Sequence, residues 1–334
     1  MKIITKNGKD YLKTSVKKIN NFSVDCSTLF NDIEEYLDKN ENSNLQHFYD
    51  RFSCSYFSPS FMKSYMENPM NTIFNSVSSE GVNDATAIGT TYHKIMEDYY
   101  SLPKEERNRE MLDKLEEDLT PFGMDQKRLH QYVEGYKDIK DYLDENNELD
   151  DTKLDCFCEY KGKTQVYIPK FDITLPIPLS YIVDRIDVRD GKLYILDYKT
   201  GRQGRHSATF DGYLGSMILY KWVIEQDFGM EVDKGYLIAP HLDNKYIELD
   251  YSLVNESKLV DDFYDFYEQF KKDTETRVYS FTNKGYFTSD DMREYRRKMQ
   301  DSSVDTINIE IYIGENEEKE DENTVKMEDY EIPF

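Results

Sequence analysis

The chain lacks any run of about 18 apolar residues, the length that a membrane-spanning helix needs, and its mean hydropathy is −0.78. The N-terminal segment MKIITKNGKDY is charged where a secretory signal would be apolar. Cysteine is scarce, and its four residues, Cys26, Cys54, Cys156 and Cys158, contain no C-x2-C pair of a zinc knuckle. We therefore expect a cytoplasmic protein with reduced thiols, neither secreted nor embedded in a membrane.

Positive charge is also in deficit, since 42 Lys and Arg stand against 66 Asp and Glu, a formal net charge of −24. A protein that coats nucleic acid needs a broad basic surface, so this balance argues against that class and leaves room for a local phosphate-binding site. Residues 301–334 hold 12 acidic and two basic side chains. Such a segment buries little, and we expect an acidic, mostly disordered tail there.

The hydrophobic pattern before the tail predicts an α/β protein. Asn7-Gly8 separates two alternating runs, which predicts a hairpin within an N-terminal extension of residues 1–55. A helical period dominates residues 56–150, where an apolar stripe runs from Ile88 to Tyr99. Residues 151–300 begin with strand-like alternation. Helices over 210–227 and after Asn255 follow, with a strand over 234–239 between them.

The most informative segment is residues 181–201, YIVDRIDVRDGKLYILDYKTG. Asp190-Gly191 predicts a two-residue turn, so that paired residues on the two strands have numbers that sum to 381. Asp184 and Asp197 would then lie opposite each other, with Cβ atoms roughly 4.5–5.5 Å apart. Two facing carboxylates repel unless a cation lies between them or one of them is protonated. A divalent metal is the simpler solution.

Lys199 shares the face of Asp197, because side chains alternate along a strand. Carboxylate oxygens suit Mg²⁺ or Mn²⁺, and a metal with open positions beside a lysine favours hydrolysis of a phosphodiester. Asp187 has the opposite parity to Asp184, so we interpret it as a surface or structural carboxylate. An ordinary charged hairpin is the alternative for the whole set.

The spacing Asp-x12-Asp-x-Lys resembles the PD-(D/E)XK nuclease superfamily, and the surrounding words resemble its RecB-like exonuclease family. The similarity runs in order through five words: SPSF…NP at 58–69, GTTYHKIME at 89–97, VDRID at 183–187, LDYKTG at 196–201 and MILY at 217–220. It covers roughly residues 55–285. There are departures, since Ser216 stands at a Gln position, Tyr181 at a Gly position and Asn68 at a Cys position.

The resemblance implies a restriction-endonuclease-like fold, a mixed central sheet flanked by helices with a helical insertion, in a nuclease domain over residues 56–300. It implies that Asp184 and Asp197 bind the metal with His93 and the Tyr198 carbonyl. Lys199 would stabilise the attacking hydroxide. Because Asn68 replaces the family's early cysteine and no cysteine follows Cys158, we expect no iron–sulfur cluster.

The resemblance also implies further contacts to single- or double-stranded DNA, in recombination, repair or replication. Glu97 and Tyr220 are candidates for DNA contact or for support of the metal ligands. Arg202, Arg205 and His206 form a basic cluster close to Lys199, which suits a phosphate-contacting loop. The chain has no G-x4-G-K-[ST] word for ATP, so a helicase or recombinase would be a separate partner. The composition, rich in Lys, Asn and Tyr, suggests a phage or bacterial source.

Two questions of function stay open from the sequence. The chain is either an active deoxyribonuclease or a catalytically silent nuclease-like module that binds DNA or a repair protein. The C-terminal MEDYEIPF resembles the tip of bacterial single-stranded-DNA-binding proteins, and Ile332, Pro333 and Phe334 would then dock a replication or recombination partner. A solvated tail with a chance ending, or a tail that blocks the enzyme's own DNA groove, are the alternatives.

Overall fold

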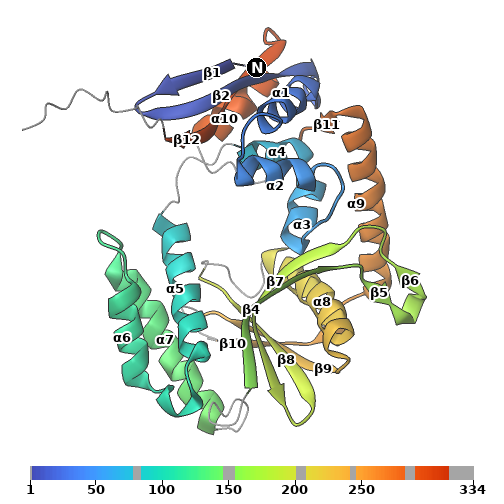
Figure 1. The fold of residues 1–334 in the computed structure, drawn as a ribbon. Helices are drawn as coiled ribbons and strands as arrows, with labels where there is room; N and C mark the ends of the chain where they lie inside the picture. Colours follow the sequence, from blue (N-terminus) through green and yellow to red (C-terminus); the bar gives the residue numbers. More distant parts are fainter. Residues whose placement is uncertain are drawn as a thin grey trace, which may run out of the picture.

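The structure is a computed structural model that describes residues 2–77, 84–145, 155–200, 208–240, 246–282 and 290–315. Its central sheet has the strand order β10-β9-β8-β7-β4 (Figure 1). The bounds of these strands are Asp155–Thr164 for β4, Leu179–Arg189 for β7, Lys192–Tyr198 for β8, Val232–Ile238 for β9 and Tyr246–Leu249 for β10. The pair β8 and β9 is parallel and the others are antiparallel, so the sheet is mixed as expected.

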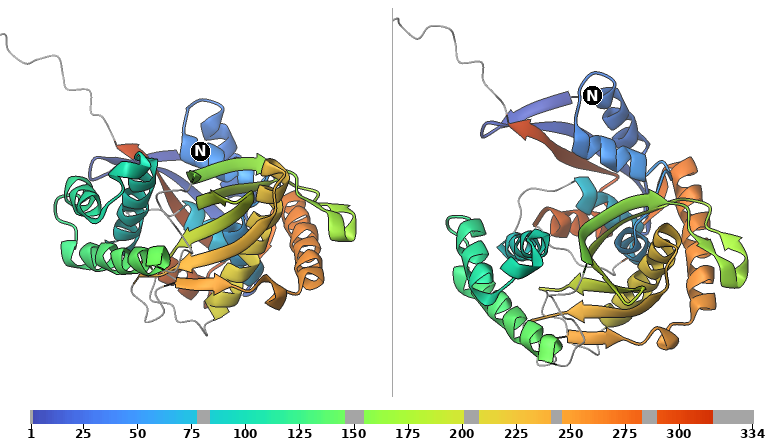
Figure 2. Two further views of the ribbon diagram at one scale, coloured as in Figure 1. Left: turned by 90° about the horizontal axis from the view of Figure 1, so that it is seen from below. Right: turned by 60° about the horizontal axis from the view of Figure 1, so that its bottom comes forward.

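Helices cover both faces of the central sheet. On one side lie α5 (Asp84–Ser101), α6 (Arg109–Leu119) and α7 (Gln126–Glu145). On the other side lie α8 (Ala208–Phe228) and α9 (Glu256–Thr276), as both views in Figure 2 show. Helix α8 makes the crossover that parallel strands require between β8 and β9. Asn255 caps α9 by accepting a hydrogen bond from the backbone amide of Lys258 at 3.0 Å.

A second sheet lies above the central one in Figure 1 and has the order β1-β2-β3-β11, with β12 paired to β2. Its strands are Lys2–Lys6, Lys9–Asn20, Ser23–Asp25, Val278–Ser280 and Thr306–Glu315 for β1, β2, β3, β11 and β12. The predicted first hairpin is present, and its turn residues Asn7 and Gly8 have φ of 52° and 73°. These positive angles are those of a tight hairpin turn.

Strand β12 corrects the expected boundary of the tail at residue 301. Ile307, Ile309 and Ile311 alternate along it and are at most 1% exposed, and they pair with β2 from Val16 to Leu12. Residues 306–315 therefore belong to the folded body, because their apolar face closes the upper core. The charges of residues 301–334 indicate an exposed segment when they are counted together, and such a count does not reveal the alternating isoleucines.

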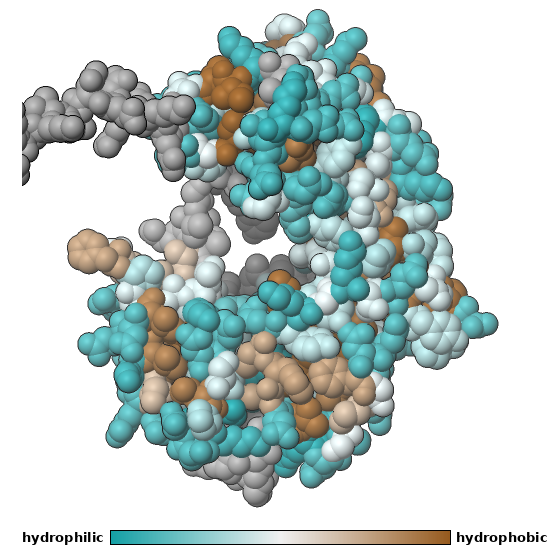
Figure 3. All heavy atoms as spheres, in the orientation of Figure 1, coloured by the Kyte–Doolittle hydropathy of each residue, from teal (hydrophilic) through white to brown (hydrophobic). Residues whose placement is uncertain are grey.

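Further helices join the two sheets. They are α1 (Ser27–Leu37), α2 (Ser43–Arg51), α3 (Pro59–Glu67), α4 (Pro69–Val77) and α10 (Asp290–Gln300). A small pair, β5 (Tyr167–Ile168) and β6 (Ile173–Thr174), precedes β7, and three 3-10 turns cover Lys104–Glu106, Pro169–Phe171 and Tyr251–Leu253. Among the described helices none is long and apolar enough to cross a membrane. Figure 3 shows a hollow below the upper sheet, bordered in that view mostly by hydrophilic residues.

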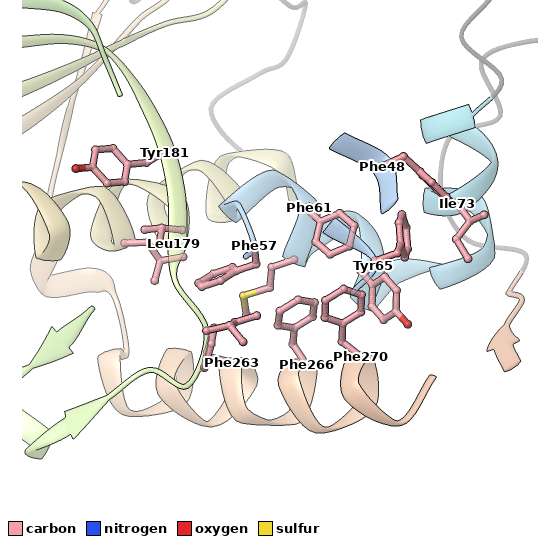
Figure 4. Close-up of a cluster of buried hydrophobic side chains, with 14 of the residues drawn as sticks. Phe48, Phe57, Phe61, Tyr65, Ile73, Leu179, Tyr181, Phe263, Phe266 and Phe270 are labelled. Carbon is pink, nitrogen blue, oxygen red and sulfur yellow. The ribbon is translucent and has the colours of Figure 1, made fainter. Parts of the chain in front are cut away.

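Aromatic rings fix α3 against α9 (Figure 4). The ring of Phe57 lies 4.8 Å from that of Phe263, and the ring of Tyr65 lies 4.9 Å from that of Phe270. Tyr65 also donates a hydrogen bond to Asp273 at 2.7 Å. Each buried ring stabilises the fold by about 1.5–3 kcal/mol through removal of apolar surface from water. This packing holds α3 rigidly beside the central sheet.

Candidate active site

The β7–β8 hairpin has the register expected from its turn. Arg189 pairs with Lys192 and Arg185 pairs with Leu196, so that the pairs sum to 381. Asp190 and Gly191 have φ of 49° and 75°, which the two-residue turn requires. This hairpin brings the two words VDRID and LDYKTG side by side.

The pairing of β7 with β8 ends at Arg185 and Leu196, just before Asp184 and Asp197. At this end Asp184 contacts Tyr198, the residue that follows Asp197. Its Oδ2 accepts a hydrogen bond from the Tyr198 backbone amide at 2.7 Å. The Asp184 side chain is 13% exposed. Burial and the Asp197 carboxylate raise the pKa of Asp184 to about 6, against the opposing effects of His93 and Lys199. The charge of Asp197 therefore disfavours ionisation of Asp184. The described pairs of β7 and β8 stop at Arg185–Leu196, so the expected pairing of Asp184 with Asp197 is not among them.

Lys199 forms an ion pair with Asp197 through its Nζ. Burial lowers the pKa of the Lys199 ammonium, but the carboxylates of Asp197 and Asp184 outweigh this effect and hold the pKa above its ordinary value. Lys199 thus stays charged at neutral pH. Its backbone amide donates to the Ile238 carbonyl at 2.8 Å, which extends the β8–β9 pairing to the lysine and fixes its position.

Helix α5 brings His93 to the end of the hairpin. The His93 Nδ1 lies 3.6 Å from Asp184 Oδ1, and the Nε2 lies 3.2 Å from the Tyr198 carbonyl oxygen. Burial lowers the pKa of His93, but the carboxylates of Glu159 and Asp184 give a net upward shift. The structure therefore brings together His93, Asp184 and the Tyr198 carbonyl, three of the metal ligands that the resemblance implies.

Glu159 on β4 joins this group and was missed by sequence reasoning. The pairs Cys158–Arg185 and Tyr160–Val183 place it across from Asp184. Its Oε1 lies 3.9 Å from His93 Nδ1. Glu159 has a φ of 47°, a left-handed backbone that is strained for a residue with a Cβ. Strand β4 contains none of the five motif words. Only the pairing of β4 with β7 could therefore have identified Glu159.

Among the described residues, His93, Glu159 and Asp184 form a possible metal-binding group. Each offers one ligand atom, and these atoms all lie within 4.8 Å of one another. The Asp197 carboxylate lies outside this group and contacts Lys199 instead. Two carboxylates, an imidazole and the nearby Tyr198 carbonyl form a mainly oxygen donor set. Such a set suits Mg²⁺ or Mn²⁺ better than a soft metal.

A cavity of about 480 Å³ opens beside this group. Its walls come from Gly89, Thr90, His93, Lys94, Glu97, Glu159 and Thr200. Glu97 lies one turn after His93 and accepts a hydrogen bond from Lys94 at 3.0 Å. It lines the cavity, but it does not belong to the donor group of His93, Glu159 and Asp184. A side chain at Gly89 would contact the Thr200 hydroxyl at 3.0 Å, which explains the small residue where α5 approaches β8.

Tyr220 on α8 is part-buried near the same site. Burial raises its pKa, and the charges of Asp197, Lys199 and Asp184 act on it as well. Arg202, Arg205 and His206, and the tip Ile332, Pro333 and Phe334, lie outside the described residues.

The position of Asp187 along its strand predicted either a surface or a structural carboxylate, and in the structure it is a structural one. It forms two hydrogen bonds of 2.6 Å with Arg185, and both side chains are fully buried. The Arg185 guanidinium carbon lies 3.5 Å from the centroid of the Tyr100 ring, and the guanidinium donates to the Tyr136 hydroxyl at 3.2 Å. This ion pair ties α5 and α7 to β7 at the residue next to Asp184.

One comparison, with the models of protein families, agrees with this architecture. The family model described as the PD-(D/E)XK nuclease superfamily matches residues 58–312. No curated protein matches the chain. A solved structure titled "Crystal structure of SSO0001" covers 71% of this chain and 81% of its own, at 10% identity and a TM-score of 0.30, a likeness too low to carry an argument. The family match spans well over half of the sequence and includes every element of the site, so the chain belongs to the PD-(D/E)XK nuclease superfamily.

Proposed function

We propose that this protein is a divalent-metal-dependent deoxyribonuclease, of the RecB-like exonuclease type, that hydrolyses phosphodiesters in DNA recombination, repair or replication. The observation that carries the proposal is the convergence of His93, Glu159 and Asp184, with Asp197 and Lys199 adjacent, at one end of the β7–β8 hairpin. Membership of the nuclease superfamily supports the same chemistry.

The residues that would hold Mg²⁺ or Mn²⁺ are His93, Asp184 and the Tyr198 carbonyl, with Glu159 as an added donor. Asp197, which the resemblance also implies as a ligand, lies outside this group and would have to share its carboxylate between Lys199 and the metal. A bound metal lowers the pKa of its water and offsets negative charge that develops on the phosphate. Asp184 orients the end of β8 through its hydrogen bond with the Tyr198 amide. This contact holds the Tyr198 carbonyl and the Lys199 side chain at fixed positions relative to the carboxylates.

Lys199 would orient the attacking hydroxide and stabilise charge on the phosphate oxygens in the transition state. Its pKa, raised by Asp197 and Asp184, keeps it protonated and therefore available as a hydrogen-bond donor. Asp197 holds the ammonium by an ion pair and so limits its motion. These interactions support a catalytic site more than a silent binding module, because a charged lysine lies beside the proposed metal ligands.

The test is digestion of end-labelled single- and double-stranded DNA in Mn²⁺ by the wild type, Asp197→Ala and Lys199→Ala. We expect cleavage by the wild type and a loss of about 10²–10³-fold in rate for Lys199→Ala, the usual cost of one transition-state donor. Lys192→Ala, at the other end of β8, is the matched control and should cut normally. A wild type no more active than Asp197→Ala would favour the silent DNA-binding module.

A further inference from the structure

A second cavity, of about 370 Å³, lies between α3, α8 and α9, away from the donor group. Its apolar wall comes from Met62, Met66, Leu219 and Leu259. Lys63, Ser216 and Asp262 provide its polar groups. Cavities of this size, mainly apolar with a few polar groups, are typical of sites for small organic rings and other flat ligands.

Tyr213 connects this cavity to the candidate active site. Its ring centroid lies 5.0 Å from the Lys199 Nζ and 6.0 Å from the Lys63 Nζ. Tyr213 and Ser216 are three residues apart on α8 and therefore share one face of the helix. One ring thus lies between the lysine of the active site and the lysine of the cavity.

Two lysines near one aromatic ring, beside an apolar cavity, match the chemistry of a nucleotide strand. Lysine ammonium groups contact phosphates, and base faces are apolar rings that stack on aromatic or apolar side chains. The Ser216 hydroxyl and the Asp262 carboxylate, which pairs with Lys258, are polar groups of the kind that contact the edge of a base. Tyr213 links the two places, because its ring lies near Lys63 of the cavity and near Lys199, which would contact the scissile phosphate.

We propose that the cavity between α3, α8 and α9 binds the nucleobase of an unpaired nucleotide next to the scissile phosphate. Lys63 contacts the phosphate on the far side of that nucleotide, and Tyr213 flanks the strand between the two phosphates. This inference rests on the proposed nuclease function and defines its substrate as DNA with an unstacked, single-stranded nucleotide at the site. A base inside a duplex is paired and stacked, so it cannot enter such a cavity.

Gly215 allows the cavity to be filled without touching the catalytic groups. A Cβ at this helical position would meet only the Leu259 Cδ1, at 4.0 Å. Gly215→Ala therefore fits with little change, whereas the longer side chain of Gly215→Leu extends into the cavity. The two variants form a matched pair, since both replace glycine within a helix and differ mainly in how far they reach.

The experiment measures binding of single-stranded oligonucleotides in Ca²⁺, each with 2-aminopurine at one of several successive positions. We expect one position to change fluorescence on binding to the wild type and to Gly215→Ala. Gly215→Leu should lose that signal and bind about tenfold or more weakly, because stacking of one base is lost. Lys63→Ala should reduce the salt dependence of binding by about one phosphate contact, and the exposed Lys39→Ala should not.

A second pair of variants covers the case in which Gly215→Leu fails to fold. Met66 is 47% exposed at the rim, so Met66→Glu should fold and should repel the strand, whereas Met66→Leu should bind normally. An unchanged 2-aminopurine signal in the folded variants that fill or charge the cavity would overturn the proposal. Cleavage by the wild type in Mn²⁺ is measured in parallel. Cleavage without a 2-aminopurine signal would contradict only the proposed base-binding role of the cavity. A 2-aminopurine signal without cleavage would contradict the proposed nuclease function.

Discussion

Single residues at the end of the hairpin carry the proposed chemistry, and Glu159 is the one that departs from sequence expectation. Its backbone adopts φ of 47°, an angle that costs roughly 1–2 kcal/mol for a residue with a Cβ. Such strain is typical of functional positions, where the surrounding structure holds an unfavourable conformation. At Glu159 the strained backbone accompanies a carboxylate that faces His93 and lines the cavity beside it.

Glu159→Gln should weaken Mn²⁺ binding by about 10–100-fold, because it removes a negative charge that either contacts the metal or orients His93. Isothermal titration of the purified variant with Mn²⁺ measures this directly. Glu97→Gln is the matched control, since Glu97 lines the same cavity but lies outside the donor group. Equal losses in the two variants would mean that the general negative charge of the cavity, rather than Glu159, governs affinity.

Asp184→Asn should abolish measurable Mn²⁺ binding and cleavage while the protein stays folded. The amide still accepts the hydrogen bond from the Tyr198 amide, but the charge needed for a hard cation is lost. Asp190→Asn, in the turn of the same hairpin, is the control, because asparagine tolerates the positive φ there. Normal metal binding by Asp184→Asn would contradict the site.

At the scale of elements, the buried pair of Arg185 and Asp187 fixes α5 and α7 against the hairpin. Parity along the strand predicted that Asp187 faces away from Asp184, but it did not predict a fully buried salt bridge. That outcome depends on Tyr100 and Tyr136, which are distant in sequence and surround the guanidinium only once the helices pack. Long-range burial of this kind has no local signal in a strand.

Arg185→Leu should lower the free energy of unfolding by about 3–5 kcal/mol, because it leaves the Asp187 carboxylate buried without a partner. The double variant Arg185→Met with Asp187→Leu should be more stable than the single one, since both charges are removed together. Urea denaturation followed by circular dichroism measures both. If the double variant is no more stable than Arg185→Leu, the pair does not act as a unit.

For the whole molecule, local patterns predicted the parts better than their assembly. The turns at Asn7-Gly8 and Asp190-Gly191 depend on neighbouring residues alone, and the structure has them as expected. The expected division at residue 301 differs from the fold, because β12 pairs with a strand near the opposite end of the chain. Isoleucines alternate with polar residues from Ile307 to Ile311, which is the pattern of a strand with one buried face.

The role of the tail is testable by truncation after Glu315, the last described residue. This variant keeps the whole β12 ladder and the candidate active site. Loss of binding to a replication or recombination protein in a pull-down would support the docking tip of Ile332, Pro333 and Phe334. Faster cleavage of DNA would support a tail that blocks the active site, and no change in either measurement would support neither role.

A second truncation, after Asp305, tests how the fold is closed. It also removes β12 and with it Ile307, Ile309 and Ile311, three side chains that are at most 1% exposed. Loss of one such residue to alanine costs about 2–5 kcal/mol, and the net stability of a typical domain is only about 5–15 kcal/mol. We therefore expect the variant truncated after Asp305 to be unfolded or insoluble, judged by circular dichroism against the variant truncated after Glu315. A stable, active protein without residues 306–334 would show that the upper sheet does not need β12, and the nuclease core would then be independent of the chain's last strand.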